Sequence, residues 1–396
     1  MAVAVSGGGD SMALLDLAAT WAKETQTALW VLTVDHKLRA EAADEIALVA
    51  ARCGALGLGF QVLDWSDWDH QGNLMDQARR ARYRLMADWA HRAGIADILL
   101  AHTRDDQAET LLMRLGRGAG VDGLAAMRPR RNLFGVTWHR PLLGFGRSDL
   151  RDHLRARSLK WAEDPSNDDP AFSRIQMRHL QETLSAVGIT PQALGQVAEN
   201  MAMAADALEA QADAAAQEAL SCQFDALVLD RDKLRAWPSE TQRRVVLRCL
   251  KWFRQADYAP RQSKLETFVE AVLGGTPATL EGCQVCDHKG RSWIFKEWRV
   301  VQHVESKADT LWDGRWRLRK CPADQAEVTV RPLGQEGATA LAEHWRGVAP
   351  RAAILATPAI FCANDFIAAP LLAATPDWEM AAKNRKESLY QRAVTH

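Results

Sequence analysis

The 396-residue sequence lacks any apolar run that approaches the roughly 18 consecutive residues needed to cross a membrane as a helix. Its first residues, Met-Ala-Val-Ala-Val-Ser-Gly-Gly, carry neither the basic segment nor the long apolar segment of a secretory signal. Internal repeats and low-complexity tracts are also absent. With 47% hydrophobic and 25% charged residues, the composition excludes a disordered or fibrous protein. These features predict a globular cytoplasmic protein without a membrane span.

Cysteine is scarce, with seven residues, and only Cys53 lies in the first half of the chain. A disulfide scaffold is not expected in so long a chain without an export signal. Near the close pair Cys283 and Cys286 lie only His288 and His303, whereas a zinc site needs two further ligands at suitable spacing. Two interpretations stay open for the pair: a metal site, or buried thiols beside a turn.

Charge is balanced overall, at a net −1, but unevenly distributed. Residues 128–178 hold eleven Lys or Arg against six Asp or Glu, whereas residues 181–240 hold three against ten. A basic surface for a polyanion beside an acidic helical segment explains this distribution, and so do two differently solvated faces.

In the first 145 residues, short β-branched or aliphatic runs alternate with longer segments of helical periodicity. Such alternation is typical of βαβ units, in which helices cover both faces of a parallel sheet. The sequence therefore predicts an α/β fold with a Rossmann-like sheet, whose ligands bind outside the carboxyl ends of the strands. The expected strands are residues 2–5, 29–34, 60–65, 97–101 and 135–139, and the expected helices are residues 12–23, 42–56, 74–93 and 107–115.

The pattern changes after about residue 178. Residues 193–220 are Ala-rich and keep a helical apolar period over many turns, and residues 241–253 and 264–272 indicate further helices. Short strands are expected towards the end of the chain. We therefore expect three domains: an α/β domain at 1–180, a helical domain at 181–305 and a small α+β domain at 306–396.

A glycine-rich loop, Ser6-Gly7-Gly8-Gly9-Asp10-Ser11, joins the first expected strand to the first expected helix. Its glycines let backbone N–H groups approach a ligand closely, and the helix N-terminus adds partial positive charge, so phosphate is the natural ligand. The loop is neither a Walker motif nor a G-x-G-x-x-G motif. Asp10 would repel a polyphosphate unless Mg²⁺ lies between them. The alternative is that Asp10 or Ser11 only caps the helix.

Further polar residues are expected at the same edge of the sheet. Asp35 and His36 follow the second strand. Asp106 and Glu109 lie three residues apart on one helix face, where two carboxylates repel each other unless a cation joins them. A metal ion or a substrate ammonium group would supply that cation.

A stretch with several glycines, from Arg114 to Leu124, indicates a mobile loop near this edge. Arginines suit contacts with phosphate, although helix caps and turns are an equally good structural explanation for several of these positions. The candidates are Arg114, Arg117, Arg140, Arg174 and Arg178.

Together and in this order, these segments resemble the tRNA(Ile)-lysidine synthetases, a family of PP-loop ATP pyrophosphatases, which split ATP between the α and β phosphates. The resemblance is dense over residues 2–180, where Gln77-Ala78-Arg79-Arg80-Ala81-Arg82-Tyr83 also fits the family pattern, and it continues weakly at 330–334 and 349–351. The chain departs from the pattern at Ile175, where Asn is common, and in having few residues ahead of the first strand.

The resemblance implies that L-lysine is joined to carbon 2 of the wobble cytidine in the CAU anticodon of tRNA(Ile), with ATP converted to AMP and pyrophosphate. The glycine loop, with Ser6 and Ser11, would hold ATP phosphates, and Asp10 would bind Mg²⁺. Asp35 and His36 would position ATP or assist the metal, and Asp106 and Glu109 would bind the lysine ammonium or a second Mg²⁺. The five arginines named above would contact tRNA or lysine. A homodimer is compatible with the sequence.

The alternative enzyme class is another RNA-modifying ATP pyrophosphatase that thiolates or amidates its substrate. Thiolation calls for cysteines near the catalytic domain, where only Cys53 is found, and amidation calls for an ammonia-generating domain, which is not evident. An RNA-binding protein that has lost catalysis is a further alternative, against which the acidic residues of the loop and helices argue.

Overall fold

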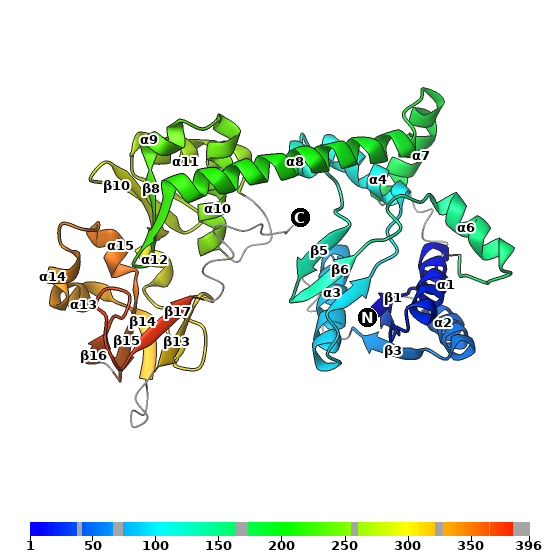
Figure 1. Ribbon diagram of the computed structural model, residues 1–396, viewed down its shortest axis with the longest axis horizontal. Coiled ribbons are helices and arrows are strands. Elements are labelled where there is room, and N and C mark those ends of the chain that lie inside the picture. The colour runs from blue at the N-terminus through cyan, green and yellow to red at the C-terminus, as the bar shows by residue number, and fades with distance from the viewer. Residues whose placement is uncertain are drawn as a thin grey trace. The chain divides into compact units, whose positions relative to one another are not determined.

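The computed structural model describes residues 1–37, 42–65, 74–163, 173–254, 260–320, 328–363 and 365–382 (Figure 1). The chain divides into two compact units, Met1–Ala205 and Asp206–Ala393. The three domains expected from the sequence stay a prediction. No helix in the described ranges is both long and apolar enough to span a membrane.

The first unit contains a six-stranded sheet in the order β3-β2-β1-β4-β6-β5. Five strands run parallel, and β5 pairs antiparallel with β6, so the predicted α/β fold is confirmed. The sequence did not predict β5, because its residues Arg-Arg-Asn-Leu form no apolar run. A tight turn at Phe134 and Gly135, both with positive φ, adds this strand to the sheet edge. The strands are β1 (Ala2–Ala4), β2 (Trp30–Asp35), β3 (Gly59–Asp64), β4 (Asp97–Leu99), β5 (Arg130–Leu133) and β6 (Val136–His139).

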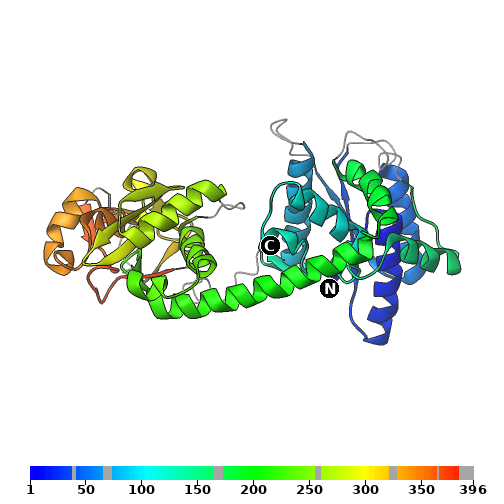
Figure 2. The same cartoon turned by 90° about the horizontal axis from the view of Figure 1, so that it is seen from above.

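Helices follow the parallel strands, as the alternation in the sequence predicts. The last of them, α8, is one uninterrupted helix that begins in this unit and ends in the second, in agreement with the long helix expected at 193–220 (Figure 2). The helices are α1 (Gly9–Glu24), α2 (Ala42–Leu56), α3 (Leu74–Arg92), α4 (Arg104–Leu115), α5 (Val121–Leu124), α6 (Arg147–Ala156), α7 (Ser173–Ala186) and α8 (Pro191–Ala219).

Both faces of this sheet are buried, because successive side chains of a strand point to opposite sides. Val31 of β2 packs into a core with α1, α2 and α6, whereas its neighbour Leu32 packs into a second core with Tyr83 and Met86 of α3 and with Trp138. The parallel strands are therefore mainly apolar, which makes them visible in the sequence.

The strand order creates a switch point beside β1. The chain runs from β1 outwards to β2 and β3, and then returns to β4 on the other side of β1. The loops that follow β1 and β4 therefore diverge, and ligands of such sheets bind in the crevice between them. The helices that begin there are α1, at Gly9, and α4, at Arg104.

The second unit contains helices and three antiparallel sheets. The predicted helices at 241–253 and 264–272 are confirmed, and a five-stranded sheet in the order β7-β8-β11-β10-β9 accompanies them. A four-stranded sheet, β12-β14-β15-β16, and the pair β13-β17 follow towards the C-terminus. The helices are α9 (Arg231–Arg235), α10 (Ser239–Phe253), α11 (Gln262–Gly274), α12 (Trp298–Val301), α13 (Gly334–Ala340), α14 (Ala342–Trp345) and α15 (Arg351–Leu355). The strands are β7 (Leu220–Gln223), β8 (Ala226–Asp230), β9 (Ala278–Leu280), β10 (Cys283–His288), β11 (Arg291–Lys296), β12 (Ser306–Lys307), β13 (Trp316–Lys320), β14 (Val328–Pro332), β15 (Pro358–Cys362), β16 (Asp365–Ala368) and β17 (Glu379–Ala382).

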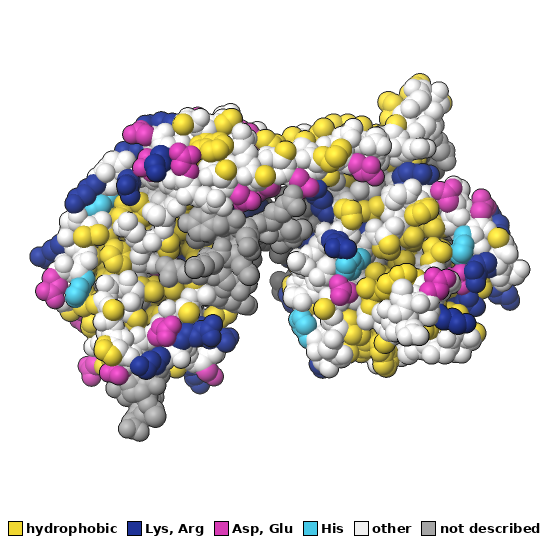
Figure 3. All heavy atoms as spheres, viewed as in Figure 1, with side chains coloured by type: hydrophobic (Ala, Val, Ile, Leu, Met, Phe, Trp, Pro, Cys, Tyr) yellow, Lys and Arg dark blue, Asp and Glu magenta, His cyan; other side chains and the backbone are white. Residues whose placement is uncertain are grey.

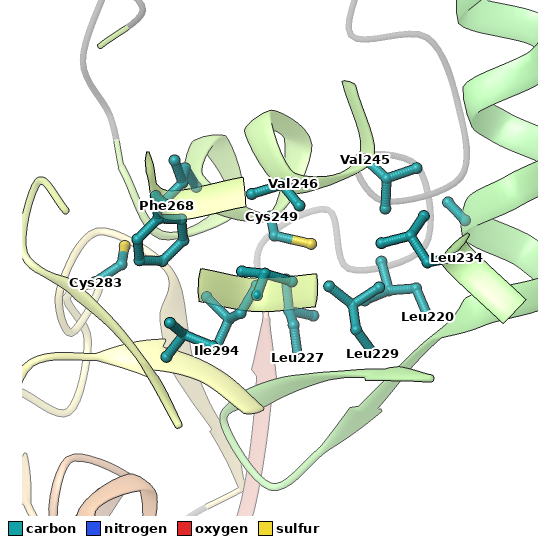
Figure 4. Close-up of a cluster of buried hydrophobic side chains, with 14 of the residues drawn as sticks. Leu220, Leu227, Leu229, Leu234, Val245, Val246, Cys249, Phe268, Cys283 and Ile294 are labelled. Atoms are coloured by element: carbon teal, nitrogen blue, oxygen red, sulfur yellow. The ribbon is translucent and has the colours of Figure 1, made fainter. Parts of the chain in front are cut away.

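The five-stranded sheet is also buried on both faces. Leu227 and Leu229 of β8 pack with Val246, Cys249 and other side chains of α10 and α11 (Figure 4). The alternate residues of β8 pack on the opposite face, in a core that they share with α13, α14 and α15. The later part of this unit therefore covers one face of the sheet formed by the earlier part.

Cys283 and Cys286 lie in strand β10, and Cys283 directly follows the turn at Glu281 and Gly282. Residues three apart on a strand point to opposite faces, so Cys283 is buried in one core and Cys286 packs against the other. In the described ranges, no group of three or more His, Cys, Asp or Glu side chains is placed to hold a metal ion. Burial raises the pKa of Cys283 to about 12, so its thiol stays protonated. The structure favours the interpretation of buried structural thiols.

A buried ion pair joins two segments of the second unit that lie 90 residues apart in the sequence. The Arg315 guanidinium donates to both carboxylate oxygens of Asp225, at 2.7 and 2.9 Å, and lies 5.0 Å from the centre of the Phe253 ring. The indole N–H of Trp316 donates to the same carboxylate at 2.9 Å. Although burial favours the neutral form, Asp225 and Asp313 raise the pKa of Arg315 above its usual value. The pair is therefore ionised and fully hydrogen-bonded.

Replacement of Asp225 by Ala should lower the free energy of unfolding by about 3–5 kcal/mol, because it leaves a buried guanidinium without its main partner. Denaturant unfolding followed by tryptophan fluorescence measures this loss. The control is Asp232→Ala, which removes an exposed partner of Arg235 at 3.0 Å and should cost about 0–1 kcal/mol. Equal losses for the two variants would contradict the importance given to the buried pair.

Candidate active site

The glycine loop after β1 is closed on itself by its two serines. The Ser6 N–H donates to the Ser11 hydroxyl at 3.1 Å, and that hydroxyl donates to the Gly8 carbonyl at 2.9 Å. The N-cap of α1 is Gly8, which provides no side-chain cap. The N–H groups of the first turn of α1 are therefore available to an anion, as at other phosphate-binding helix N-termini.

Close neighbours explain the glycines of this loop. Gly7 has a φ of +88°, and a Cβ there would lie 3.2 Å from the Cβ of Glu45 in α2. At Gly9 a Cβ would lie 3.4 Å from the Trp161 ring. The Ala162 N–H donates to the Gly7 carbonyl at 2.9 Å. The loop is thus held between α2 and the segment that follows α6.

Asp10, in the first turn of α1, does not cap its helix. Its carboxylate accepts a hydrogen bond from the Arg147 Nε–H at 3.4 Å. Burial raises the pKa of Asp10 above its ordinary value, Arg147 opposes that rise, and the neighbouring Asp106 adds to it. Binding of Mg²⁺ by Asp10 stays a prediction.

Arg147 joins three carboxylates that all lie far from it in the sequence. Besides Asp10, its guanidinium donates to Asp106 Oδ1 at 2.6 Å and to Glu109 Oε1 at 2.9 Å. Although burial favours the neutral form, Asp106 and Glu109 raise the pKa of Arg147 above its usual value. The cation expected between Asp106 and Glu109 is thus present in the protein itself. Binding of Mg²⁺ or of a substrate ammonium group by Asp106 and Glu109 stays a prediction.

Arg147 was not among the site residues predicted from the sequence. It begins α6, the helix that follows β6 in the chain, and so it lies at the same carboxyl edge as the other candidates. Only this position at the sheet edge indicated a site residue. The carboxylates that Arg147 contacts are 38 to 137 residues away along the chain, so no local pattern links them to it.

Asp106 is fixed in place by a capping box at the start of α4. Its Oδ2 accepts the Thr103 N–H at 2.8 Å and the Thr103 hydroxyl at 3.0 Å, while its other oxygen faces Arg147. The first turns of α4 and α6 also bind each other, since the Arg147 N–H donates to Asp105 at 2.9 Å. The carboxylates of α4 are therefore held rigidly against α6.

A second charge cluster holds α6 against the two helices on either side of the loop. Asp16 of α1 is buried and contacts Arg52 of α2 at 2.6 Å, His153 of α6 at 2.9 Å, and Arg157, which directly follows α6, at 3.1 Å. Because α6 is fixed at this end, Arg147 at its other end keeps its distance from Asp10.

Asp35 and His36 lie at the end of β2, as predicted. Asp35 accepts the backbone N–H of Lys37 at 2.8 Å, and His36 stacks edge-on against Trp65, with ring centres 5.5 Å apart. The part of both residues in binding ATP stays a prediction.

The five candidate arginines differ in their surroundings. Arg114 donates to the carbonyls of Gly123 and Ala126 at 2.8 and 2.9 Å and so shapes the glycine-rich loop, and Arg117 is exposed. Arg140 is buried and donates to His102 Nδ1 at 3.2 Å. The side chains of Arg174 and Arg178, in α7, lie outside the described residues. Direct contacts of any of the five with tRNA or lysine stay a prediction.

The donor set fits a magnesium ion shared with a nucleotide. Mg²⁺ in nucleotide sites usually takes one or two protein carboxylates together with phosphate oxygens. Asp10 offers such a carboxylate beside the loop, with 26% of its side chain exposed. The neighbouring carboxylates already share Arg147, and the described side chains form no ready-made metal cage.

A phosphate-binding glycine loop at the switch point of a parallel sheet defines a nucleotide-binding α/β protein of the PP-loop class. The model of the PP-loop domain family matches residues 1–183. The tRNA(Ile)-lysidine synthase of Ruegeria pomeroyi is 42% identical over 397 residues, which cover 100% of this chain and 94% of that protein. The chain belongs to the tRNA(Ile)-lysidine synthase family.

Further similarities extend over smaller parts of the chain. The tRNA(Ile)-lysidine synthase of Wolbachia pipientis wMel is 33% identical over 343 residues, which cover 84% of this chain and 80% of that protein. Among solved structures, a U34-tRNA thiolase from Methanococcus maripaludis with its [4Fe-4S] cluster matches at a TM-score of 0.45 and 16% identity, over 50% of this chain and 70% of that one.

Replacement of Arg147 by Met should lower the free energy of unfolding by about 3–5 kcal/mol, because the carboxylates of Asp106 and Glu109 lose their shared cation. Arg147→Lys keeps the charge and should cost less. The control Arg155→Met, in the same helix, removes an exposed pair with Asp152 and should cost about 0–1 kcal/mol. Denaturant unfolding compares the three. The assignment is wrong if Arg147→Met is no more harmful than the control.

Proposed function

We propose that this chain uses ATP to join L-lysine to carbon 2 of the wobble cytidine in the CAU anticodon of tRNA(Ile), through an adenylated cytidine. The products are lysidine, AMP and pyrophosphate. One observation carries the proposal: the carboxylates of Asp10, Asp106 and Glu109 meet at Arg147, directly beside a phosphate loop. This arrangement offers places for an anionic nucleotide and for a cationic amino acid next to each other, and family membership supports the same reaction.

The chemistry needs two steps. The carbonyl oxygen on carbon 2 of cytosine is a poor leaving group, and transfer of AMP to that oxygen, with loss of pyrophosphate, makes it a phosphate leaving group. The ε-amine of lysine then attacks carbon 2, and AMP departs with the oxygen. Division of one difficult displacement into two easier ones is the usual benefit of covalent activation, placed here on the substrate.

The nucleotide is assigned to the loop. The backbone N–H groups of Gly7, Gly8 and Gly9 and the hydroxyls of Ser6 and Ser11 would hold the β and γ phosphates. Asp10 would hold Mg²⁺, which would neutralise phosphate charge as pyrophosphate departs. Three carboxylates and one guanidinium leave a net charge of −2 at the cluster, which matches one divalent cation.

The amino acid is assigned to the carboxylate pair. Asp106 and Glu109 already bind one side-chain cation, so an ammonium group of lysine suits the same pair. A carboxylate of this pair is the candidate base that takes the proton from the attacking amine. Asp35 and His36, at the end of the neighbouring strand, are assigned to positioning ATP.

The tRNA is assigned to the arginines, namely Arg114, Arg117, Arg140, Arg174 and Arg178. An anticodon loop is single-stranded, so the target base is readily unstacked and brought to the sheet edge. The second unit is assigned to the rest of the tRNA. The proposal places the enzyme in the cytoplasm, where its substrates are, and a homodimer can be tested by size-exclusion chromatography.

Thiolation, the alternative reaction, finds little support in the described residues. Cys53, the one cysteine of the first unit, is buried in α2. Burial raises its pKa to about 11, so its thiol is neither exposed nor ionised.

Incorporation of labelled lysine into tRNA(Ile) with a CAU anticodon, followed by nucleoside analysis, tests the proposed function. Asp10→Asn should lower the rate at least about 100-fold, because charge developing on the phosphates loses its stabilisation. Asp44→Asn, the same change at an exposed first-turn position of α2, should leave the rate unchanged. Formation of ADP in place of AMP, or full activity of Asp10→Asn, would contradict the proposal.

A further inference from the structure

Arginine side chains gather around Tyr83, at the end of the sheet where the glycine loop also lies. The guanidinium groups of Arg79 and Arg82 lie 5.5 and 5.7 Å from the centre of the Tyr83 ring. These residues come from the first half of α3, which starts at the carboxyl edge of the sheet. With three neighbours they form what we call the Tyr83 arginine cluster: Arg79, Arg82, Arg114, Arg131 and Arg140.

The members of this cluster repel one another. Burial lowers the pKa of Arg114, and the charges of Arg131 and Arg79 lower it further. Burial also lowers the pKa of Arg140, where Tyr83 opposes the shift and Arg79 and Arg131 add to it. The strand register agrees with this repulsion, because Arg131 of β5 pairs with Trp138 of β6 and the Trp138 ring lies 4.6 Å from the Tyr83 ring.

Within the part of the chain that the structure describes, no carboxylate forms an ion pair with Arg79, Arg114, Arg131 or Arg140. Arg140 is only 3% exposed, and the buried Nε of Arg131 has no hydrogen-bond partner. Buried arginines are normally paired with acids, as Arg147 is, because an unpaired buried charge is costly.

Two titratable groups beside the cluster show the effect of its positive charge. Burial and the charge of Arg140 lower the pKa of His102 to about 3, so this ring is neutral and accepts the Arg140 Nε–H through Nδ1. Burial raises the pKa of Tyr83, and the charges of Arg79, Arg82 and Arg140 outweigh that effect and lower it. The cluster is therefore a built site for an external anion.

We infer that the Tyr83 arginine cluster binds the phosphate backbone of the anticodon loop beside the target cytidine. The inference rests on the proposed function, and it adds Arg79, Arg82 and Arg131 to the residues that contact RNA. Several guanidinium groups match a chain of phosphodiesters, whereas the single carboxylate of lysine would neutralise only one of them. The guanidinium fork also suits phosphate oxygens.

The position of the cluster determines how a bound RNA loop is oriented towards the active site. His102 contacts Arg140 of the cluster at 3.2 Å, and the charge of Asp106 acts on the same ring. The arginines attract phosphates, and the carboxylates repel them. An RNA loop held by the arginines therefore directs an unstacked base, which is uncharged, towards the carboxylates and the glycine loop.

In Figure 3, Lys and Arg side chains are interspersed with Asp and Glu over both units, as expected for solvated surfaces. The Tyr83 arginine cluster differs because its charges are of one sign and partly buried.

Binding of an isolated anticodon stem-loop RNA, without ATP or lysine, tests the inference. Arg79→Gln and Arg131→Gln should each weaken binding about tenfold, and each should reduce the slope of log Kd against log salt by about 0.7 for one lost phosphate contact. An unrelated stem-loop of equal length should show the same loss of slope, because phosphate contacts carry no sequence information. Failure of lysidine formation would not affect these measurements, so they are independent of the proposed function.

The control is Arg84→Gln, which removes the same charge from an exposed position of α3 that faces Phe134. Its affinity and slope should match the wild type. A purely structural role would lower Tm in Arg131→Gln, whereas relief of repulsion should leave Tm unchanged or raised. Unchanged affinity and slope in both cluster variants would overturn the inference. A raised KM for lysine with unchanged RNA binding would overturn it in favour of the lysine carboxylate.

Discussion

One guanidinium organises the active-site edge of the first unit. Arg147 contacts carboxylates from α1 and α4, and its own helix, α6, is fixed to α1 and α2 through Asp16. Three like charges gathered beside a phosphate loop would otherwise repel each other and push the helices apart. The shared cation thus allows an acidic site to exist before any substrate binds. It also sets the distance between the phosphate loop and the carboxylate pair. The two steps of the reaction must be coordinated across this distance.

The second unit depends on a comparable contact, the buried pair of Asp225 and Arg315. Val228 and Trp293 face the part of this unit that follows residue 330, whereas Leu227 and Ile294 face α10 and α11. Neither part can leave the shared sheet without exposing apolar side chains and a buried charge. Because the two parts share this core, we expect them to unfold together.

Local patterns explain what the sequence predicted well. Strands buried on both faces leave continuous apolar runs, and helices between them leave a period of 3.6 residues, so the alternation was visible. The repulsion between Asp106 and Glu109 predicted a cation, because residues three apart on a helix are neighbours. The identity of that cation was hidden, since Arg147 comes from a segment 38 residues further on and no local rule links the two. β5 was not predicted because a polar edge strand forms through pairing with its neighbour and a turn, and these leave no apolar pattern in the sequence.

The arginines show why burial cannot be inferred from residue type. Arg140 was chosen from the sequence as a contact for a substrate, and the structure buries it beneath the edge, against a neutral His102. Its charge still acts at the surface, because the surrounding protein screens it poorly and no described acid pairs with it. Burial of an unpaired guanidinium costs free energy in the free protein. An anion that binds beside it removes this cost, and the difference in free energy favours binding. Acidic and basic groups are thus separated along one sheet edge, and this separation suits an enzyme whose substrates are a polyanion and a cation.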